Sequence, residues 1–181
     1  MKKKFFISLC ILFFILVGFT YAQKEQVRVS PKASVMQVVG LTEVKIDYSR
    51  PGVKKRTIWG ELVPYNKVWR AGANEATTIS FSSDVLIEGE KLPAGKYSFF
   101  AIPTKDEWTL IFNKVAEQWG AFEYNEAEDA LRITIKPKGN GFQEWLTYSF
   151  TDYDVKSQSA VINLEWEKLK VPFKVKVSDN N

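Results

Sequence analysis

Apolar and polar residues alternate with a period of two along most of the sequence from residue 44 on. The alternation is clearest in three segments: Val44 to Tyr48, Leu131 to Lys136 and Lys170 to Val177. Successive side chains of a β-strand point to opposite faces, so this pattern is typical of strands that bury one face and expose the other. Amphipathic helical periods are nearly missing. The sequence therefore predicts an all-β fold.

Further strands are expected where β-branched and aromatic residues alternate between turns. These strands are expected from Thr77 to Phe81, Tyr97 to Ala101, Trp108 to Phe112, Leu146 to Phe150, and Ile162 to Trp166. The second and third should pair as a hairpin across Pro103 to Asp106. Lys138 to Gly141 is expected to form another hairpin turn.

Short helical turns are expected only near Ile58 to Val63 and near Val115 to Trp119. Eight to ten short strands with Gly- and Pro-containing turns are typical of sandwiches and barrels. We therefore predict a single-domain antiparallel β-sandwich or a flattened, jelly-roll-like barrel. It should carry one long irregular loop and at most one or two short helical turns.

The N-terminus has the three regions of a secretory signal peptide. Lys2 to Lys4 form a charged start, Phe5 to Phe19 carries no charge, and the run closes on small residues ending at Ala22. We expect cleavage after Ala22, which makes 1–22 the signal peptide and 23–181 a single β-sandwich domain. The destination would be the periplasm or the outside of the cell. A retained N-terminal anchor is the alternative, but a membrane span needs about 20 apolar residues and this run is shorter.

The residues that most enzymes and metal sites rely on are missing. The chain has no histidine, and its only cysteine, Cys10, would leave with the signal peptide. This excludes a Cys nucleophile, a Ser-His-Asp triad and an ordinary zinc site. The acidic residues Glu123, Glu126, Glu128 and Asp129 lack the spacing of a calcium loop and are expected to be solvated. We expect no metal and no cofactor.

The net charge gives no reason to expect a nucleic-acid or membrane partner. Of 25 basic residues, set against 21 acidic ones, three lysines lie in the signal peptide, so the exported domain is almost neutral. A nucleic-acid-binding surface needs a marked excess of positive charge. Lipid attachment is not expected either, because Cys10 follows Leu9 rather than a small residue. The expected partner is an unknown small ligand, or a glycan or peptide of the cell envelope.

The segment from Ser49 to Ala76 follows neither a strand period nor a helix period. Long loops of this kind in compact domains are uncommon and often functional. Arginine forks recognise carboxylates, phosphates and hydroxyls, and tryptophan beside polar anchors lines many ligand clefts. We therefore take as candidate ligand-binding residues Arg50, Arg56, Trp59, Trp69, Arg70, Asn74 and Glu75. No catalytic residue is assigned.

A structural interpretation of the same segment stays open beside the functional one. Arg50, Arg70 and Glu75 would then form a buried ion pair that fixes the loop to the sandwich. Trp59 and Trp69 would anchor the loop to the core rather than stack on a ligand.

Several long strings of the sequence resemble one family. They are Asp47 to Pro51, Trp69 to Thr77, Leu92 to Tyr97, Ile111 to Lys114, and Trp119-Gly120. On these strings the chain resembles an exported bacterial family catalogued as domain of unknown function 2911, over essentially the whole exported part. The resemblance implies an exported β domain. It implies no activity and supplies no catalytic residues.

Three functions remain open at this stage. The first is a non-catalytic binding domain of the cell envelope, with a glycan, a peptide or a small anion as its ligand. The second is a structural or assembly protein that uses an exposed sheet edge. The third is a glycan-active enzyme built on two carboxylates, for which Glu75 with Glu61 or Asp47 is the pair to test.

Overall fold

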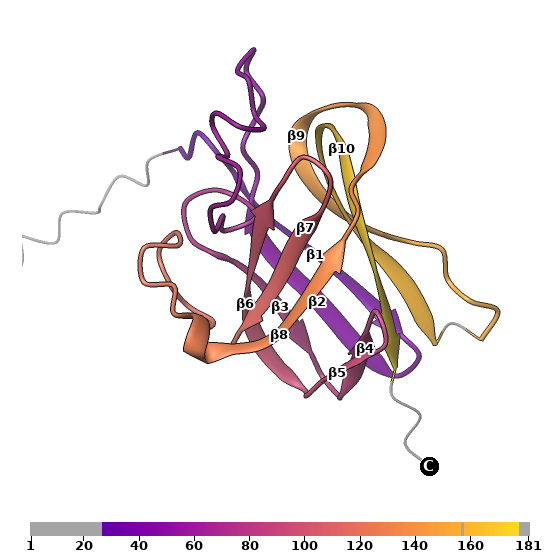
Figure 1. Ribbon diagram of the computed structural model, residues 1–181. Coiled ribbons are helices and arrows are strands. Elements are labelled where there is room, and N and C mark those ends of the chain that lie inside the picture. Colours follow the sequence, from indigo (N-terminus) through magenta and orange to yellow (C-terminus); the bar gives the residue numbers. More distant parts are fainter. Residues whose placement is uncertain (1–26, 157, 178–181) are drawn as a thin grey trace, which may run out of the picture.

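The computed structural model describes residues 27–156 and 158–177, which form two antiparallel β-sheets packed face to face (Figure 1). The larger sheet has the strand order β1-β2-β3-β6-β7-β8, and the smaller one has the order β5-β4-β10-β9. In the larger sheet the strands are β1 (Lys32–Val39), β2 (Thr42–Ser49), β3 (Thr77–Phe81), β6 (Gly95–Pro103), β7 (Trp108–Asn113) and β8 (Asp129–Ile135). In the smaller sheet they are β4 (Val85–Ile87), β5 (Glu90–Leu92), β9 (Lys138–Thr151) and β10 (Ser159–Val177). The predicted all-β fold is confirmed, in its sandwich-like form rather than as a closed barrel.

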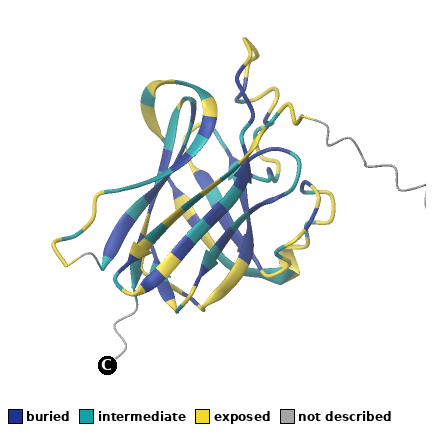
Figure 2. Ribbon diagram, turned by 180° about the vertical axis from the view of Figure 1, so that it is seen from behind, coloured by how far each residue is buried: buried dark blue, intermediate teal, exposed yellow. Residues whose placement is uncertain are grey.

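The core fills the space between the sheets because alternate side chains of each strand point inward. In β2, Val44, Ile46 and Tyr48 are buried, whereas Lys45 and Asp47 between them are not. Buried and less buried residues alternate along the strands in the same way in Figure 2. The expected strands of the larger sheet are confirmed, and so is the hairpin of β6 and β7, in which Pro103 lies opposite Trp108.

Two predictions for the C-terminal half are wrong. The segment Lys138 to Gly141 is not a turn but the start of β9, where Gly139 pairs with Leu169. The two last expected strands are one strand, β10, which continues through an irregularity at Glu167 (φ 56°). The polar residues Glu167 and Lys168 interrupt the apolar pattern and resemble a turn in the sequence. The strand nevertheless stays continuous, because β10 pairs with β9 before and around this point and with β4 near its end.

Neither of the two expected helical turns is present. Residues 58–63 form a tight turn that is closed by a backbone hydrogen bond from Val63 N to Ile58 O (2.9 Å). Residues 115–119 are irregular. Among the described residues the single helical turn is the 3₁₀ turn η1 (Glu126–Glu128), where the Asn125 side chain accepts a hydrogen bond from Ala127 N.

Strands β1, β4 and β5 were not predicted. In β1 the outward-facing Met36 and Val38 are half exposed while Val39 on the opposite face is buried. Apolar residues on both faces hide the period of two. Strands β4 and β5 are only three residues long, too short to show any period.

The irregular segment between β2 and β3, residues 50–76, is the long loop that the sequence predicts. It covers the upper end of the sandwich in the view of Figure 1. Trp69 and Ala101 exchange two backbone hydrogen bonds of 2.8 Å, which fix the loop to β6. Val53 N donates to Glu144 O, and this bond fixes it to β9 of the other sheet. The loop is therefore tied to both sheets.

The expected signal peptide, residues 1–22, lies outside the described residues. Within the described part of the chain, no helix has the length and apolar character needed to cross a membrane.

Candidate ligand-binding site

Arg50 fixes the loop to the smaller sheet. Its Nε donates to Leu146 O (2.8 Å) and its Nη2 donates to Thr147 Oγ1 (2.7 Å), so the guanidinium is committed to β9. Its backbone N–H also donates to Pro31 O (2.9 Å). The ion pair of Arg50 or Arg70 with Glu75 that the structural interpretation expected is not formed. Arg50 nevertheless has a structural role.

Trp59 and Trp69 belong to a cluster of four tryptophans beneath the loop, together with Trp108 and Trp166. Trp69 stacks on Trp166 with ring centroids 6.0 Å apart, and Trp59 meets Trp108 edge-on at 4.8 Å. Trp69 is only 9% exposed, and its Nε1 donates to Gly72 O. The other indoles cover the ring faces that a sugar would need, so both residues act as anchors for the loop.

A pocket of about 330 Å³, here called the loop pocket, opens between the loop, residues 27–31 before β1 (the N-terminal arm) and β10. It brings together four of the seven candidate residues, and Arg50, Trp59 and Glu75 lie outside its lining. The full lining is Val29, Ser30, Pro51, Gly52, Lys54, Arg56, Leu62, Val63, Trp69, Arg70, Gly72, Ala73, Asn74 and Trp166.

Arg70 is the unusual residue of the loop pocket. Its side chain makes no hydrogen bond and no ion pair with any described residue, and its Nε is buried without an acceptor. Burial lowers the pKa of the Arg70 guanidinium below its ordinary value through desolvation. An added Cβ at Gly120 would lie 3.3 Å from Arg70 Nη1, so the guanidinium reaches this glycine closely. A partly desolvated cation without a partner is costly unless something outside the described chain compensates it.

The other charged residues that line the loop pocket, Lys54 and Arg56, are also positive. Arg56 donates from Nε to Val53 O (3.1 Å) and from Nη2 to Gly52 O, which fixes its guanidinium. Lys54 Nζ lies 5.6 Å from the ring centroid of Trp145. Among the described residues that line this pocket three are basic and none is acidic, and the carboxylate beside it is that of Glu144, which accepts from Lys54 N (2.9 Å).

The backbone next to Arg70 is strained. Ala71 (φ 49°) and Asn74 (φ 59°) are both left-handed, a conformation that costs a non-glycine residue about 1 kcal/mol. Ala71 is held there because its carbonyl accepts hydrogen bonds from Tyr148 Oη (2.8 Å) and Thr77 Oγ1 (3.0 Å). Such strain persists only where the surroundings enforce it, and it is common at binding sites.

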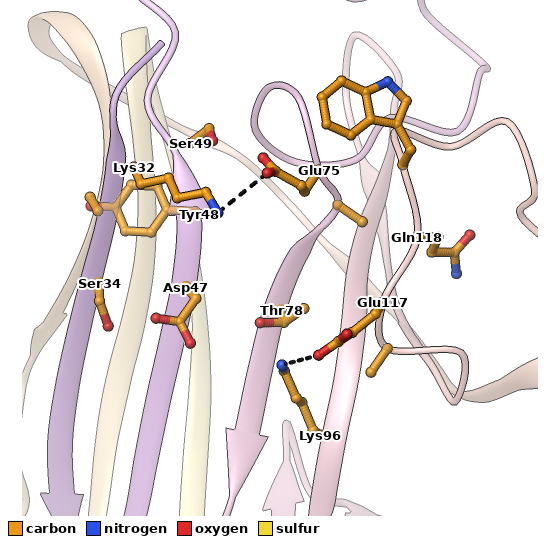
Figure 3. Close-up of a pocket in the computed structure, with 14 residues that line it drawn as sticks. Lys32, Ser34, Asp47, Tyr48, Ser49, Glu75, Thr78, Lys96, Glu117 and Gln118 are labelled. Carbon is orange, nitrogen blue, oxygen red and sulfur yellow. Dashed lines mark hydrogen bonds and ion pairs between the residues drawn. The ribbon is translucent and has the colours of Figure 1, made fainter. Parts of the chain in front are cut away.

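Glu75 lies in a second and larger cavity, which runs over the outer face of the larger sheet (Figure 3). Arg28 donates two hydrogen bonds of 2.7 Å to its carboxylate, and Lys32 Nζ lies 3.3 Å away. The Arg28 hydrogen bonds hold the pKa of Glu75 at about 2. Glu75 is therefore ionised at all ordinary pH values.

The carboxylate pairs considered for an enzyme do not have the chemistry of a glycosidase. Such an enzyme needs one carboxyl group with a raised pKa to act as the general acid. Glu75 has a lowered pKa instead, and Asp47, which lines the same cavity, is paired with Lys45 at 3.0 Å. Glu61 is exposed on the turn at 58–63 and lines neither cavity.

The acidic segment before β8 is held by protein groups. Asp129 accepts hydrogen bonds from Asn113 Nδ2 (2.8 Å) and Tyr124 Oη (2.6 Å), and Arg132 pairs with both Asp129 and Glu126. In the described ranges, no group of three or more potential metal ligands is arranged to hold an ion.

Lys54, Val29 and Ser30 line the loop pocket but are not among the candidate residues indicated by the sequence. Lys54 belongs to the basic run Lys54 to Arg56 inside the loop. That run was the available signal. Nothing in the sequence indicated Val29 or Ser30, because they reach the loop pocket only through the tertiary path of the N-terminal arm.

The family assignment follows from a match over most of the described chain. The sequence model of the family described as "Protein of unknown function (DUF2911)" matches residues 30–175. The chain belongs to this family. The matched DUF2911 region contains all ten strands at least in part, the long loop and nearly all of the loop-pocket lining. No curated protein and no solved structure matches the chain.

Proposed function

We propose that this DUF2911 protein is an exported, non-catalytic binding domain that holds an anionic group of a small ligand in the loop pocket. The observation that carries the proposal is the Arg70 side chain, which is partly buried, cationic and without any acceptor among the described residues. A carboxylate or phosphate would accept from its guanidinium and neutralise it.

The surroundings of Arg70 support an anion rather than a cation or an apolar ligand. Lys54 and Arg56 add two further positive charges to the same lining. Asn74 contributes a side-chain amide, whose Nδ2 also donates to Ser30 O (3.3 Å). Because Arg50 is committed to β9, the predicted anion-binding role falls to Arg70 alone of these two arginines.

The volume of the loop pocket restricts the ligand. About 330 Å³ is near the lower end of the range for small-molecule pockets, about 300–1,000 Å³. This supports a small organic anion, or the anionic end of a larger molecule, over an extended polymer. Among the described residues of the lining no nucleophile is hydrogen-bonded to a base, which supports binding rather than catalysis.

The proposal is tested by thermal unfolding of residues 23–181 with sodium phosphate, sulfate, acetate and citrate, at constant ionic strength. Saturable stabilisation is expected, of about 2.7 kcal/mol at 100 times the Kd. Arg70→Gln should abolish it. The matched control is Lys55→Gln, which removes one positive charge from the same loop at an exposed residue outside the lining, and it should respond like the wild type.

Two results would overturn the proposal. One is an Arg70→Gln variant with an unchanged response, which would assign any stabilisation to general salt effects. The other is a flat response to all four anions, which would favour a structural role for the loop. Export is tested separately by N-terminal sequencing of the protein from cell fractions. Cleavage after Ala22 is expected, and an intact N-terminus would contradict it.

A further inference from the structure

The larger cavity, here called the sheet groove, has a volume of about 720 Å³ and lies outside the proposed anion site. Its floor is the outer face of the larger sheet, and its wall is formed by Glu75, Ala76 and the segment 116–119 (Figure 3). Only Glu75 of the candidate residues lines it. The sheet groove therefore needs its own explanation.

A polar row crosses the floor of the sheet groove. Ser34 on β1 lies opposite Asp47 on β2, and Asp47 lies opposite Thr78 on β3. Neighbouring strands are about 4.8 Å apart, so a carboxylate is flanked by two hydroxyls at regular spacing. All three side chains point away from the core, as the buried residues Ile46 and Ile79 of the same strands confirm. The row offers acceptors and donors that are suited to a ligand with several hydroxyl groups.

Each lysine that lines the sheet groove is paired with a carboxylate of the wall. Lys32 on β1 reaches Glu75 on the wall at 3.3 Å, and Lys96 on β6 reaches Glu117 on the wall at 3.0 Å. Figure 3 shows these two ion pairs on either side of the polar row. Unlike Arg70 in the loop pocket, both lysines that line the sheet groove have an acidic partner. A neutral polar ligand fits this arrangement better than an ionic one.

The rim of the sheet groove carries an exposed tryptophan. The side chain of Trp119 is 59% exposed, although its backbone bridges that of Glu75. The next residue, Gly120, has a positive φ of 67° and donates its N–H to Asn74 O (3.1 Å), so the backbone that carries the indole is held in place. Phe122, which approaches Gly120, is 84% exposed. Large exposed aromatic residues beside a cavity mark interaction sites.

We propose that the sheet groove is a binding site for a neutral oligosaccharide. One sugar ring packs its C–H face on Trp119, while the hydroxyls of a neighbouring ring hydrogen-bond to Asp47 and Thr78. An aromatic platform next to a few polar anchors is the composition of such a site. A peptide added as a strand is disfavoured, because the floor is a sheet face whose backbone groups pair within the sheet.

The test is isothermal titration of residues 23–181 with four probes: cellooligosaccharides, maltooligosaccharides, chitooligosaccharides and xylooligosaccharides. Saturable binding of at least one probe is expected, with a Kd between about 10 μM and 1 mM. Trp119→Ala and Asp47→Asn should each weaken it at least about tenfold. The matched control is Trp145→Ala, at a partly exposed tryptophan outside the sheet groove, which should leave the Kd unchanged. Unfolding curves of the variants check that each one is folded.

Two outcomes overturn the inference. The first is the absence of binding by all four probes up to about 5 mM. The second is binding that Trp119→Ala leaves unchanged. The result is independent of the anion proposal, because Arg70→Gln should retain saccharide binding and Trp119→Ala should retain the response to anions.

Discussion

Replacing Arg70 with methionine should stabilise the ligand-free protein. The guanidinium has no acceptor or acidic partner among the described residues, and its Nε is buried. Methionine keeps an unbranched apolar stem and removes the charge and the orphaned donor. A group retained for binding at the expense of stability is expected to behave in this way.

The expected change in the free energy of unfolding follows from the hydrogen-bond donors of each arginine. A buried donor without a partner costs about 1–3 kcal/mol, and since Arg70 is only partly buried we expect a gain of about 1 kcal/mol for Arg70→Met. Arg50→Met is the matched comparison in the same loop. It removes two hydrogen bonds to β9 from a charged donor and should destabilise by about 2–4 kcal/mol.

Urea unfolding in phosphate-free buffer, followed by tryptophan fluorescence, measures both variants. With a urea m-value of about 2 kcal/mol/M, the Arg70→Met midpoint should rise by about 0.5 M. A saturating anion should reverse the order, because the wild type gains about 2.7 kcal/mol at 100 times the Kd and the variant gains nothing. Destabilisation of ligand-free Arg70→Met by about 1 kcal/mol or more would refute the reasoning, since Arg70 would then contribute to the fold as Arg50 does.

Three further predictions concern the pH dependence and the packing of the fold. Arg28 holds the pKa of Glu75 at about 2 against an ordinary 4.5. The ionised Glu75 carboxylate therefore stabilises the folded state fully above about pH 4.5, and this contribution is lost as the pH falls toward 2. Because the side chains of the pair are about one-third exposed, Glu75→Gln should lower the free energy of unfolding by only about 1 kcal/mol at pH 7. It should also flatten the dependence of this free energy, measured with urea, on pH between these two pH values. An unchanged pH dependence would contradict a stabilising ion pair. Gly72→Ala places a Cβ 2.7 Å from Thr77 Oγ1 and should lower the free energy of unfolding in urea by about 2 kcal/mol. The loss should be smaller in a Thr77→Ala background, which removes the clashing hydroxyl. Strictly additive losses of the two substitutions would exclude this clash. Trp166→Ala should cost about 4 kcal/mol and reduce the near-ultraviolet circular dichroism of the tryptophan cluster, and a loss below about 1 kcal/mol would show that the cluster is loosely packed.

The strands whose period of two is clearest in the sequence are those with one buried and one solvated face. β2 and β8 show a clear period of two because their outward residues are largely polar. β1 was missed because Met36 and Val38 face outward, and β10 was divided because Glu167 looks like a turn. Whether a polar interruption ends a strand depends on the pairing of its neighbours, and those neighbours are distant in the sequence.

The sequence by itself determined the fold class, the family and the position of the irregular loop, because periodicity, turn residues and family-like strings are local properties of the chain. It could not assign different roles to Arg50 and Arg70, which are both arginines of one irregular loop. The acceptors of Arg50 lie 96 and 97 residues away on β9, whereas no described residue accepts a hydrogen bond from the Arg70 side chain. The sheet groove is likewise a product of register, which places Ser34, Asp47 and Thr78 side by side from three strands. Tertiary structure decided these features for one reason. Whether an arginine finds an acceptor, and whether polar side chains of different strands lie side by side, both depend on residues that only folding brings into contact.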